Sequence, residues 1–371
     1  MNRKLLPSLI AFATIGAAHA ADSVPMPTVY GKINVSLNKN DFESINTTTK
    51  QSEQTTDNWN LNSNASRLGF KGDLPISDSL KAIYKLEYEI ITTADKEGDN
   101  GSDFKQRNTY VGLQSKDWGT LIAGRHDTPL KLAQESVDQF NDYYLGDMKN
   151  VLVGENRLNN IIMYTTPTFA GFSLTAGFAP GEGSGNNTGT TSAAQHDNND
   201  NGLADKYSIA LSYKLDTLYL ALAQDKNIIN TDVTRFVAQY GIGPVKLGAL
   251  YQTAERTKKY DTIGTVSSDG GFDLIPTGNF KEQDAFLLSA AWDINKEWTV
   301  KGQYVQSEST PTTAGLDDTE AKMYELGVDW KLSKSSTVFA YYSAIDTEGD
   351  NSISSDSTTD NTVGVGYELK F

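Results

Sequence analysis

Apolar and polar residues alternate along most of this chain, in short runs that are separated by turn-forming sequences. The run 80–90, LKAIYKLEYEI, is the clearest: every second residue is apolar or aromatic, and Lys85, Glu87 and Glu89 stand on the opposite face. This period of two residues indicates a β-strand, because successive side chains of a strand point to opposite faces. An apolar face opposed to a charged face suits a strand that lies between lipid and a water-filled lumen.

Sixteen runs of this kind can be placed, at 28–37, 67–72, 80–90, 107–114, 120–125, 159–166, 172–178, 207–215, 218–223, 235–240, 245–251, 285–293, 298–306, 323–332, 338–345 and 362–371. The tight connections between them fall at 75–79, 117–119, 167–170, 241–244, 294–297 and 333–335. The long polar connections fall near 40–58, 180–204, 255–281, 309–319 and 347–360. Short turns at one end and long loops at the other are typical of outer-membrane barrels. The sequence therefore predicts an all-β fold, a 16-stranded antiparallel transmembrane β-barrel with short periplasmic turns and long outer loops.

A soluble all-β sandwich or solenoid would also show alternation. It would not explain why aromatic residues stand at the ends of the predicted strands, where an interfacial girdle is expected. The tryptophans in such places are Trp59, Trp118, Trp292, Trp298 and Trp330. Their placement favours the membrane barrel.

One segment breaks the pattern. Between the runs 120–125 and 159–166 the alternation fails over 127–155, where Pro129 stands near the start and acids and aromatics crowd together. We interpret this segment as a constriction loop that folds into the barrel and narrows it. Tyr143 and Tyr144 allow two interpretations: they line the narrowed pore, or they pack the loop against the wall.

The N-terminus predicts export. Arg3 and Lys4 precede an apolar run, Leu5 to Ala17, and Ala18-His19-Ala20 has the small residues of a cleavage site, so residues 1–20 are predicted to be a cleaved secretory signal peptide of Gram-negative type. The apolar run is too short for a membrane anchor, and no later run reaches the ~18 apolar residues of a helical span. The barrel would then occupy 21–371. The chain has no Cys, so its stability has a source other than disulfides.

Charge and motifs exclude several functions. The chain has 32 basic and 47 acidic residues, and removal of Arg3 and Lys4 leaves 30 against 47, a net −17 that argues against nucleic acid as a partner. The three His residues are scattered, and no hydrolase, zinc-protease or phosphate-loop motif is present, so no catalytic residue, enzyme activity or cofactor is predicted. The segment 197–202, DNNDNG, begins like a calcium loop, but position twelve would be Ser208 in a strand, so no metal site is predicted.

Several motifs, taken in order, carry a family resemblance: VYGKINV (29–35), SRLGFKGDL (66–74), YVGLQ (110–114), WGTLIAGR (118–125) and the terminal GYELKF (366–371). Their order and spacing resemble the general, non-specific porins of Gram-negative outer membranes, over essentially the whole chain after the signal. A terminal Phe371 after alternating apolar residues resembles the signature that the barrel-assembly machinery recognises. The resemblance implies a homotrimeric, water-filled channel in the outer membrane, among lipid and lipopolysaccharide, that is constricted by an inward-folded third loop.

The candidate site residues come from strand parity and from the resemblance. Parity directs Lys32, Arg67 and Lys85 into the lumen. The resemblance places Lys32, Arg67 and Arg125 where family members carry the basic half of the constriction, and Arg157 is a further candidate. The alternative for each is an ordinary solvated charge of the lumen.

The acidic half of the constriction would come from the third loop. Its candidates are Glu135, Asp138, Asp142 and Asp147. The P-E-F-G-G sequence of the enteric porins is missing here and DQFNDYYLGD stands in its place, so the acid that meets the basic side stays open.

The resulting prediction is an outer-membrane porin for passive diffusion of small hydrophilic solutes and ions, whose opposed lumen charges order water and sort solutes. Two alternatives are a substrate-specific channel with a saturable site and a non-conducting barrel that acts through its acidic loops. The preference for anions or cations stays open, because a basic lumen and an acidic chain point in opposite directions. Acidic clusters at 317–318 and 346–350 either bind divalent ions with lipopolysaccharide or are simply solvated.

Overall fold

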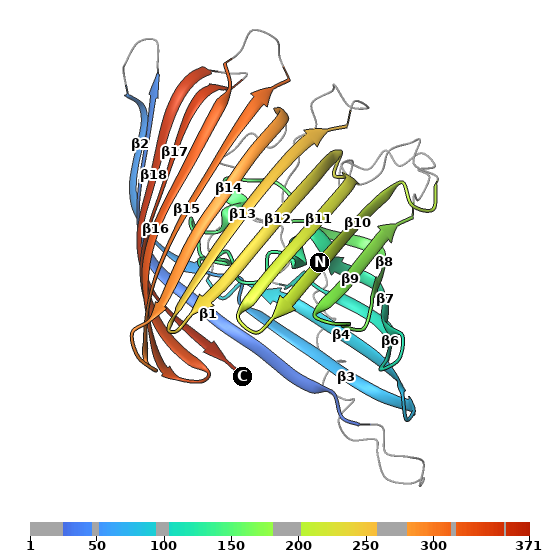
Figure 1. Cartoon of the computed structure of the whole chain (residues 1–371). Coiled ribbons are helices and arrows are strands. Elements are labelled where there is room, and N and C mark those ends of the chain that lie inside the picture. Colours follow the sequence, from blue (N-terminus) through green and yellow to red (C-terminus); the bar gives the residue numbers. More distant parts are fainter. Residues whose placement is uncertain are drawn as a thin grey trace, which may run out of the picture.

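The computed structural model shows one closed antiparallel β-barrel (Figure 1). It describes residues 25–46, 52–93, 104–180, 202–257, 280–312, 317–351 and 354–371. The predicted signal peptide and most of the predicted loops 180–204 and 255–281, including the calcium-like segment, lie outside these residues. No helix of the described ranges is long and apolar enough to cross a membrane.

Eighteen strand segments form the wall. They are β1 (Thr28–Asn46), β2 (Ser52–Ser63), β3 (Arg67–Ser77), β4 (Leu80–Ile90), β5 (Phe104–Gln106), β6 (Thr109–Ser115), β7 (Gly119–Asp127), β8 (Arg157–Thr165), β9 (Phe172–Ala179), β10 (Lys206–Leu215), β11 (Leu218–Ile228), β12 (Thr231–Ile242), β13 (Val245–Arg256), β14 (Phe280–Asp293), β15 (Trp298–Pro311), β16 (Thr319–Ser333), β17 (Ser336–Asn351) and β18 (Ser354–Lys370). Because β1 pairs with both β2 and β3, and β4 pairs with both β5 and β6, each of these pairs of segments is one interrupted strand. The wall thus has sixteen strands, which confirms the predicted fold.

The barrel closes between its first and last strands. The β1–β18 register pairs Val35 with Tyr367 and continues over the length of both strands. At its end, Gly31 and Phe371 exchange two backbone hydrogen bonds, of 2.9 and 3.1 Å. A Cβ at Gly31 would lie 2.7 Å from the Phe371 ring, so a glycine is needed where the terminal aromatic packs across β1.

Alternation in the wall follows the sequence pattern. On β12 and β13, Phe236 and Tyr251 are 47% and 52% exposed on the outer face, whereas Arg235, Val237 and Gln252 are buried on the inner face. Trp298 and Trp330 stack with ring centroids 5.5 Å apart near the short turns. The outer face is therefore apolar and carries an aromatic rim, as a membrane barrel requires.

The predicted long loops at 40–58, 309–319 and 347–360 are wrong in extent. β1 runs to Asn46 and β2 begins at Ser52, β15 and β16 narrow the second gap, and β17 and β18 extend through most of the third. As a result Trp59 lies within β2 rather than at its end, and the acids of 346–350 lie in β17. In Figure 1 these long strands rise well above their shorter neighbours. Strands that leave the membrane have water on both faces, so alternation no longer marks them.

The segment between β7 and β8, residues 128–156, lies inside the barrel; we call it the inner loop (Figure 1). It contains the short helix α1 (Pro129–Leu132) and a 3-10 turn, η2 (Met148–Asn150). Its apolar side chains form a core with small and aliphatic residues on the inner face of β10–β17. The loop members of this core are Leu130, Ala133, Val137, Leu145, Met148, Val151 and Leu152. The protein's main hydrophobic core therefore lies between this loop and one half of the wall.

Candidate functional site

Polar side chains of the wall hold the start of the inner loop in place. Thr128 caps α1 by accepting a hydrogen bond from the backbone N–H of Lys131, and Pro129 occupies the first turn, where its missing N–H is not needed. The next backbone N–H, of Leu130, donates to Ser208 Oγ of β10 over 3.0 Å. The Tyr219 hydroxyl of β11 donates to the carbonyl of Ala133 over 3.0 Å.

The middle of the loop is anchored in the same way by β14 and β15. Ser289 Oγ donates to the carbonyl of Val137 over 2.6 Å, and Ser307 Oγ donates to the carbonyl of Val151 over 2.7 Å. Irregular backbone in a protein interior leaves polar groups without secondary-structure partners, and these hydroxyl groups supply them. The loop is thus fixed to the wall rather than suspended in the lumen.

Asp138 links two parts of the inner loop to each other and to the wall. Its carboxylate accepts hydrogen bonds from the backbone N–H groups of Phe140 (3.1 Å) and Met148 (3.2 Å) and from Gln303 Nε2 (3.0 Å). The same Gln303 nitrogen donates to Glu325 Oε2 over 2.8 Å. Burial, together with the charge of nearby Asp147, raises the pKa of Asp138 to about 7. This predicted acid therefore joins loop to wall.

Two aromatic residues of the loop, Phe140 and Tyr143, pack against β16 and β17. The Tyr143 ring stacks on Phe339 of β17 with centroids 4.6 Å apart, and its hydroxyl accepts a hydrogen bond from Lys301 Nζ over 3.0 Å. Phe140 is fully buried, and a Cβ at Gly327 would lie 2.8 Å from its ring. Tyr144 packs, partly buried, against the core of the loop. Of the two interpretations of the tyrosines, the structure has them packing the loop.

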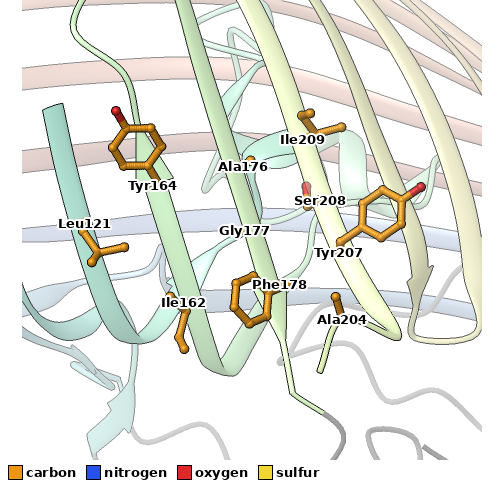
Figure 2. Close-up of a pocket in the computed structure, with 10 residues that line it drawn as sticks. All are labelled: Leu121, Ile162, Tyr164, Ala176, Gly177, Phe178, Ala204, Tyr207, Ser208 and Ile209. Atoms are coloured by element: carbon orange, nitrogen blue, oxygen red, sulfur yellow. The ribbon is translucent and has the colours of Figure 1, made fainter. Parts of the chain in front are cut away.

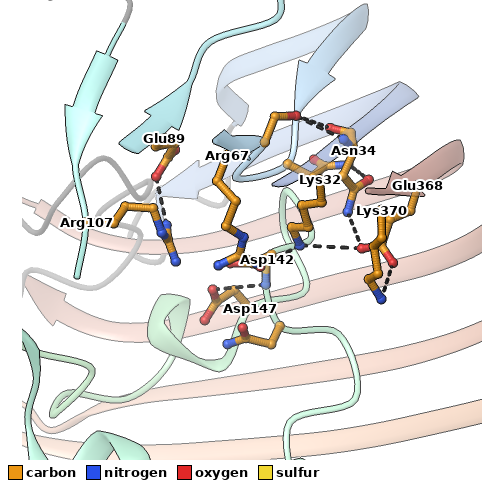
Figure 3. A network of polar contacts seen from close by, with 12 residues as sticks. Lys32, Asn34, Arg67, Glu89, Arg107, Asp142, Asp147, Glu368 and Lys370 are labelled. Atoms are coloured by element: carbon orange, nitrogen blue, oxygen red, sulfur yellow. Dashed lines mark hydrogen bonds and ion pairs between the residues drawn. The ribbon is translucent and has the colours of Figure 1, made fainter. Parts of the chain in front are cut away.

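Asp142, at the tip of the loop, meets the basic wall. Its Oδ2 accepts hydrogen bonds from Lys32 Nζ of β1 over 2.8 Å and from Arg67 Nη2 of β3 over 2.7 Å. Figure 3 shows both basic side chains converging on this carboxylate. Burial alone would raise its pKa, but the charges of Lys32, Arg67 and Arg107 outweigh burial and hold the pKa of Asp142 well below its usual range.

The neighbouring Asp147 supports the tip. It caps η2 by accepting from the backbone N–H of Lys149, and its other oxygen accepts from the N–H of Asp142 over 3.4 Å. Asp142 itself has φ of +71°, a left-handed conformation that Asp tolerates better than most residues. The turn at the tip thereby aims one carboxylate at the wall and uses the other to hold the backbone.

Arg107 is a member of this site that the sequence did not single out. It stands in the break between β5 and β6, with Nε 3.2 Å from Glu87 of β4. Its Nη1 is 2.9 Å from Glu89 of the same strand (Figure 3). Lys85 Nζ lies 3.0 Å from Glu87 as well. The two acids on the inner face of the run 80–90 were the available signal that a further basic partner was needed.

Three predicted residues have partners elsewhere than at Asp142: Arg125, Arg157 and Glu135. Arg125 stands where the pairing of β7 with β8 shifts its register; its Nη1 donates to Asn159 Oδ1 over 2.6 Å and its Nε donates to the carbonyl of Gln106 over 3.2 Å. Arg157 pairs with Asp127 over 2.9 Å at the base of the loop. Glu135, whose side chain is 44% exposed, lies 3.7 Å from Lys214 of β10.

A separate groove lies on the outside of the barrel. Leu121, Tyr164, Phe178, Tyr207 and Ile209 line it on the outward faces of β7 to β10, and Ala176 leaves it open at the centre (Figure 2). Its apolar lining belongs to the lipid-facing wall. Within the described ranges, no three His, Cys, Asp or Glu residues are grouped so that they could hold a metal.

Comparisons with known proteins agree with this architecture. The family model for Gram-negative porins matches residues 8–350. An outer membrane porin protein of Bordetella pertussis is 25% identical over 373 aligned residues, which cover 92% of this chain and 93% of the relative. The chain is similar in structure to an anion-selective porin from Comamonas acidovorans (TM-score 0.60, 21% identity, 93% and 99% of the two chains). It is also similar to the trimer form of OmpT of Vibrio cholerae (TM-score 0.59, 16% identity, 94% and 100%).

The match to the family model for Gram-negative porins rests on the sequence and extends over most of the chain. The barrel, its apolar outer face and its charged interior agree with that match. The chain belongs to the Gram-negative porins, and it is an outer-membrane porin that forms a channel for the passive diffusion of small hydrophilic solutes and ions.

Proposed function

We propose that solutes are sorted at a constriction between the tip of the inner loop and the wall of β1 to β6. Lys32, Arg67, Lys85 and Arg107 form its basic side, and Asp142 is the acid that the loop contributes. The observation that carries this proposal is the double contact of Asp142 with Lys32 and Arg67, at 2.8 and 2.7 Å. A loop tip tied to the basic wall sets the width of the passage beside it.

Selectivity at this constriction should be weak. Two neighbouring groups of ion pairs line this wall; together they contain five basic side chains, Lys32, Arg67, Lys85, Arg107 and Lys370, against four acidic ones, Glu87, Glu89, Asp142 and Glu368. The one excess positive charge favours anions. The preference is modest because water in the lumen weakens the attraction between this charge and a passing ion. The reversal potential in a salt gradient tests this. A cation preference that Arg67→Ala leaves unchanged would remove Arg67 and this network from the selectivity step.

The channel is proposed to be non-specific. A substrate-specific channel would need a binding surface in the lumen, and the candidate aromatic residues Tyr143 and Tyr144 are packed against Phe339 and the loop core instead. Solute flux should therefore rise linearly with concentration. Saturation of flux by any one solute at millimolar concentration would favour the alternative, a channel with a dedicated site.

We also propose that the protein is a homotrimer after removal of residues 1–20. The trimer form named for the similar OmpT of Vibrio cholerae supports the first part, and the export pattern of the N-terminus supports the second. Conductance steps in groups of three and an N-terminal sequence that begins at Ala21 are expected. A monomer that inserts in single steps would contradict the trimer.

A further inference from the structure

A second basic group lies on the inner wall, beyond Arg67 toward the short β3–β4 turn. Lys71 of β3 and Lys85 of β4 stand directly opposite each other in the strand register. Both share the inward face, Lys71 with Arg67 and Lys85 with Glu87. We infer that Lys71 and Lys85, held around the ring of Tyr30, form a landing site for a small oxyanion such as a phosphate on the periplasmic side of the Asp142 contact.

Tyr30 organises this pair. Its ring lies against Gly69, where a Cβ would come within 2.3 Å of the ring carbon Cζ, so only a glycine lets the ring lie across the wall. Lys71 Nζ is 5.1 Å and Lys85 Nζ is 5.7 Å from the ring centroid. The electron-rich face of an aromatic ring attracts ammonium groups at such distances. Two flexible lysines are thus gathered at one place on the wall.

The acids near this place are already engaged. Glu87 accepts the Tyr30 hydroxyl over 2.8 Å and is shared by Lys85 and Arg107. Asp73, two residues beyond Lys71, pairs with Lys81 over 2.7 Å. In the described part of the chain, no carboxylate lies within salt-bridge distance of Lys71, and this side chain is exposed to the lumen. Its positive charge is the least neutralised of the group.

Lys85 is paired with Glu87, so Lys71 supplies the charge that attracts an anion, and Lys85 supplies further hydrogen-bond donors beside it. The ammonium groups can each donate three hydrogen bonds and act as compact charges, which suits the oxygens of a phosphate or carboxylate. Because the site is solvated, binding would be weak and reversible, as conduction requires of a site along a pore. The inference rests on the proposed conducting lumen but uses different residues from the Asp142 contact.

Block by inorganic phosphate tests the site in the full-length protein in planar bilayers. Phosphate added on the periplasmic side should reduce the chloride current of the wild type in a saturable way. Lys71→Gln should raise the half-blocking phosphate concentration about two- to fourfold, the effect of one unit charge at roughly 5 Å in salt water. Lys296→Gln is the control, because it removes a lysine of the short turn between β14 and β15 and leaves Asp73 paired with Lys81, and it should leave the block unchanged.

Further variants separate the possible failures. Lys71→Arg and Tyr30→Phe keep the charge and the ring and should keep the block, whereas Tyr30→Leu should weaken it. Heat-modifiable migration in gels shows that each variant is folded. A wild type without saturable phosphate block, or equal block in Lys71→Gln, overturns the inference. If the same channels still conduct and Arg67→Ala still shifts their reversal potential, the constriction stands and only the Lys71 site fails.

Discussion

Replacing Asp142 with Asn removes the carboxylate that holds the tip of the inner loop against Lys32 and Arg67. The carboxylate accepts two hydrogen bonds from charged donors, at 2.8 and 2.7 Å, and one such bond contributes about 1.5–3 kcal/mol when both groups are sheltered. The side chains of Lys32, Arg67 and Asp142 are 10%, 23% and 14% exposed, so water screens part of the interaction between them. We expect the tip contact to weaken by about 2–3 kcal/mol in total.

The barrel itself should remain folded, because Asp138, Tyr143 and the loop core hold the rest of the loop. The ion-paired side chains of the basic wall change from five basic and four acidic to five basic and three acidic. One extra unit charge about 5 Å from a passing ion corresponds to about 0.8 kcal/mol in water, or roughly fourfold, which salt reduces to about twofold. Chloride should gain and potassium should lose by this factor, so the chloride-to-potassium permeability ratio should rise about fourfold, with noisier open-channel current.

Reversal potential in a potassium chloride gradient measures this ratio. Asp142→Glu, which keeps the charge, is the control and should stay near the wild type. The low pKa of Asp142 adds a pH test. An acid whose pKa is lowered by folding contributes stability above its unfolded-state pKa, and this stability is lost only as the pH falls through its folded-state pKa. The wild-type ratio should then stay constant through mildly acidic pH. An Asp142→Asn channel with an unchanged ratio and quiet current would refute the contact as a determinant of the pore.

Three further predictions concern the seat of the loop and the wall. Asp138 has a raised pKa, so its contribution to stability is fully present below about pH 4 and is lost as the pH rises through about 7. Asp138→Asn should therefore flatten the pH dependence of the thermal unfolding midpoint between these two pH values. An unaltered slope would contradict the raised pKa of Asp138. Tyr143→Ala removes the ring that stacks on Phe339 of the wall, so the single-channel conductance should become larger and more variable, and the free energy of unfolding should fall by about 3 kcal/mol. An unchanged conductance would contradict the role of Tyr143 in fixing the loop to the wall. Gly69→Val should lower the urea midpoint by an amount equivalent to about 1–3 kcal/mol, because the new side chain meets the Tyr30 ring; Gly302→Ala, whose Cβ meets the flexible end of a side chain at 3.3 Å, is the control and should change little.

Strand number and barrel closure could be predicted from the sequence because lipid imposes them locally. Each membrane strand has lipid on one face and water or protein on the other, so its hydrophobic pattern has a period of two wherever it crosses. The run 80–90 was predicted with the bounds that β4 has. The prediction failed at 40–58, where β1 and β2 continue in water and no solvent difference marks their faces.

The basic wall was also open to sequence reasoning, within limits. Parity directs Lys32, Arg67 and Lys85 inward, and the structure brings Lys32 and Arg67 onto one acid. Parity does not place Arg125, because the pairing of β7 with β8 shifts its register there, and its role in the pore stays a prediction. Arg107 stands in an irregular break between β5 and β6, where alternation has no meaning.

Only the tertiary structure decided which loop acid meets the wall. Asp138, Asp142 and Asp147 lie within ten residues of one another and carry the same chemical group. Their roles differ because the loop packs its apolar residues on β10–β17, which buries Asp138 among backbone donors, turns Asp147 back as a cap and leaves Asp142 at the tip. A pattern along the chain reports the solvent on each face of a strand, whereas the partner of a side chain in an irregular loop depends on residues from distant strands.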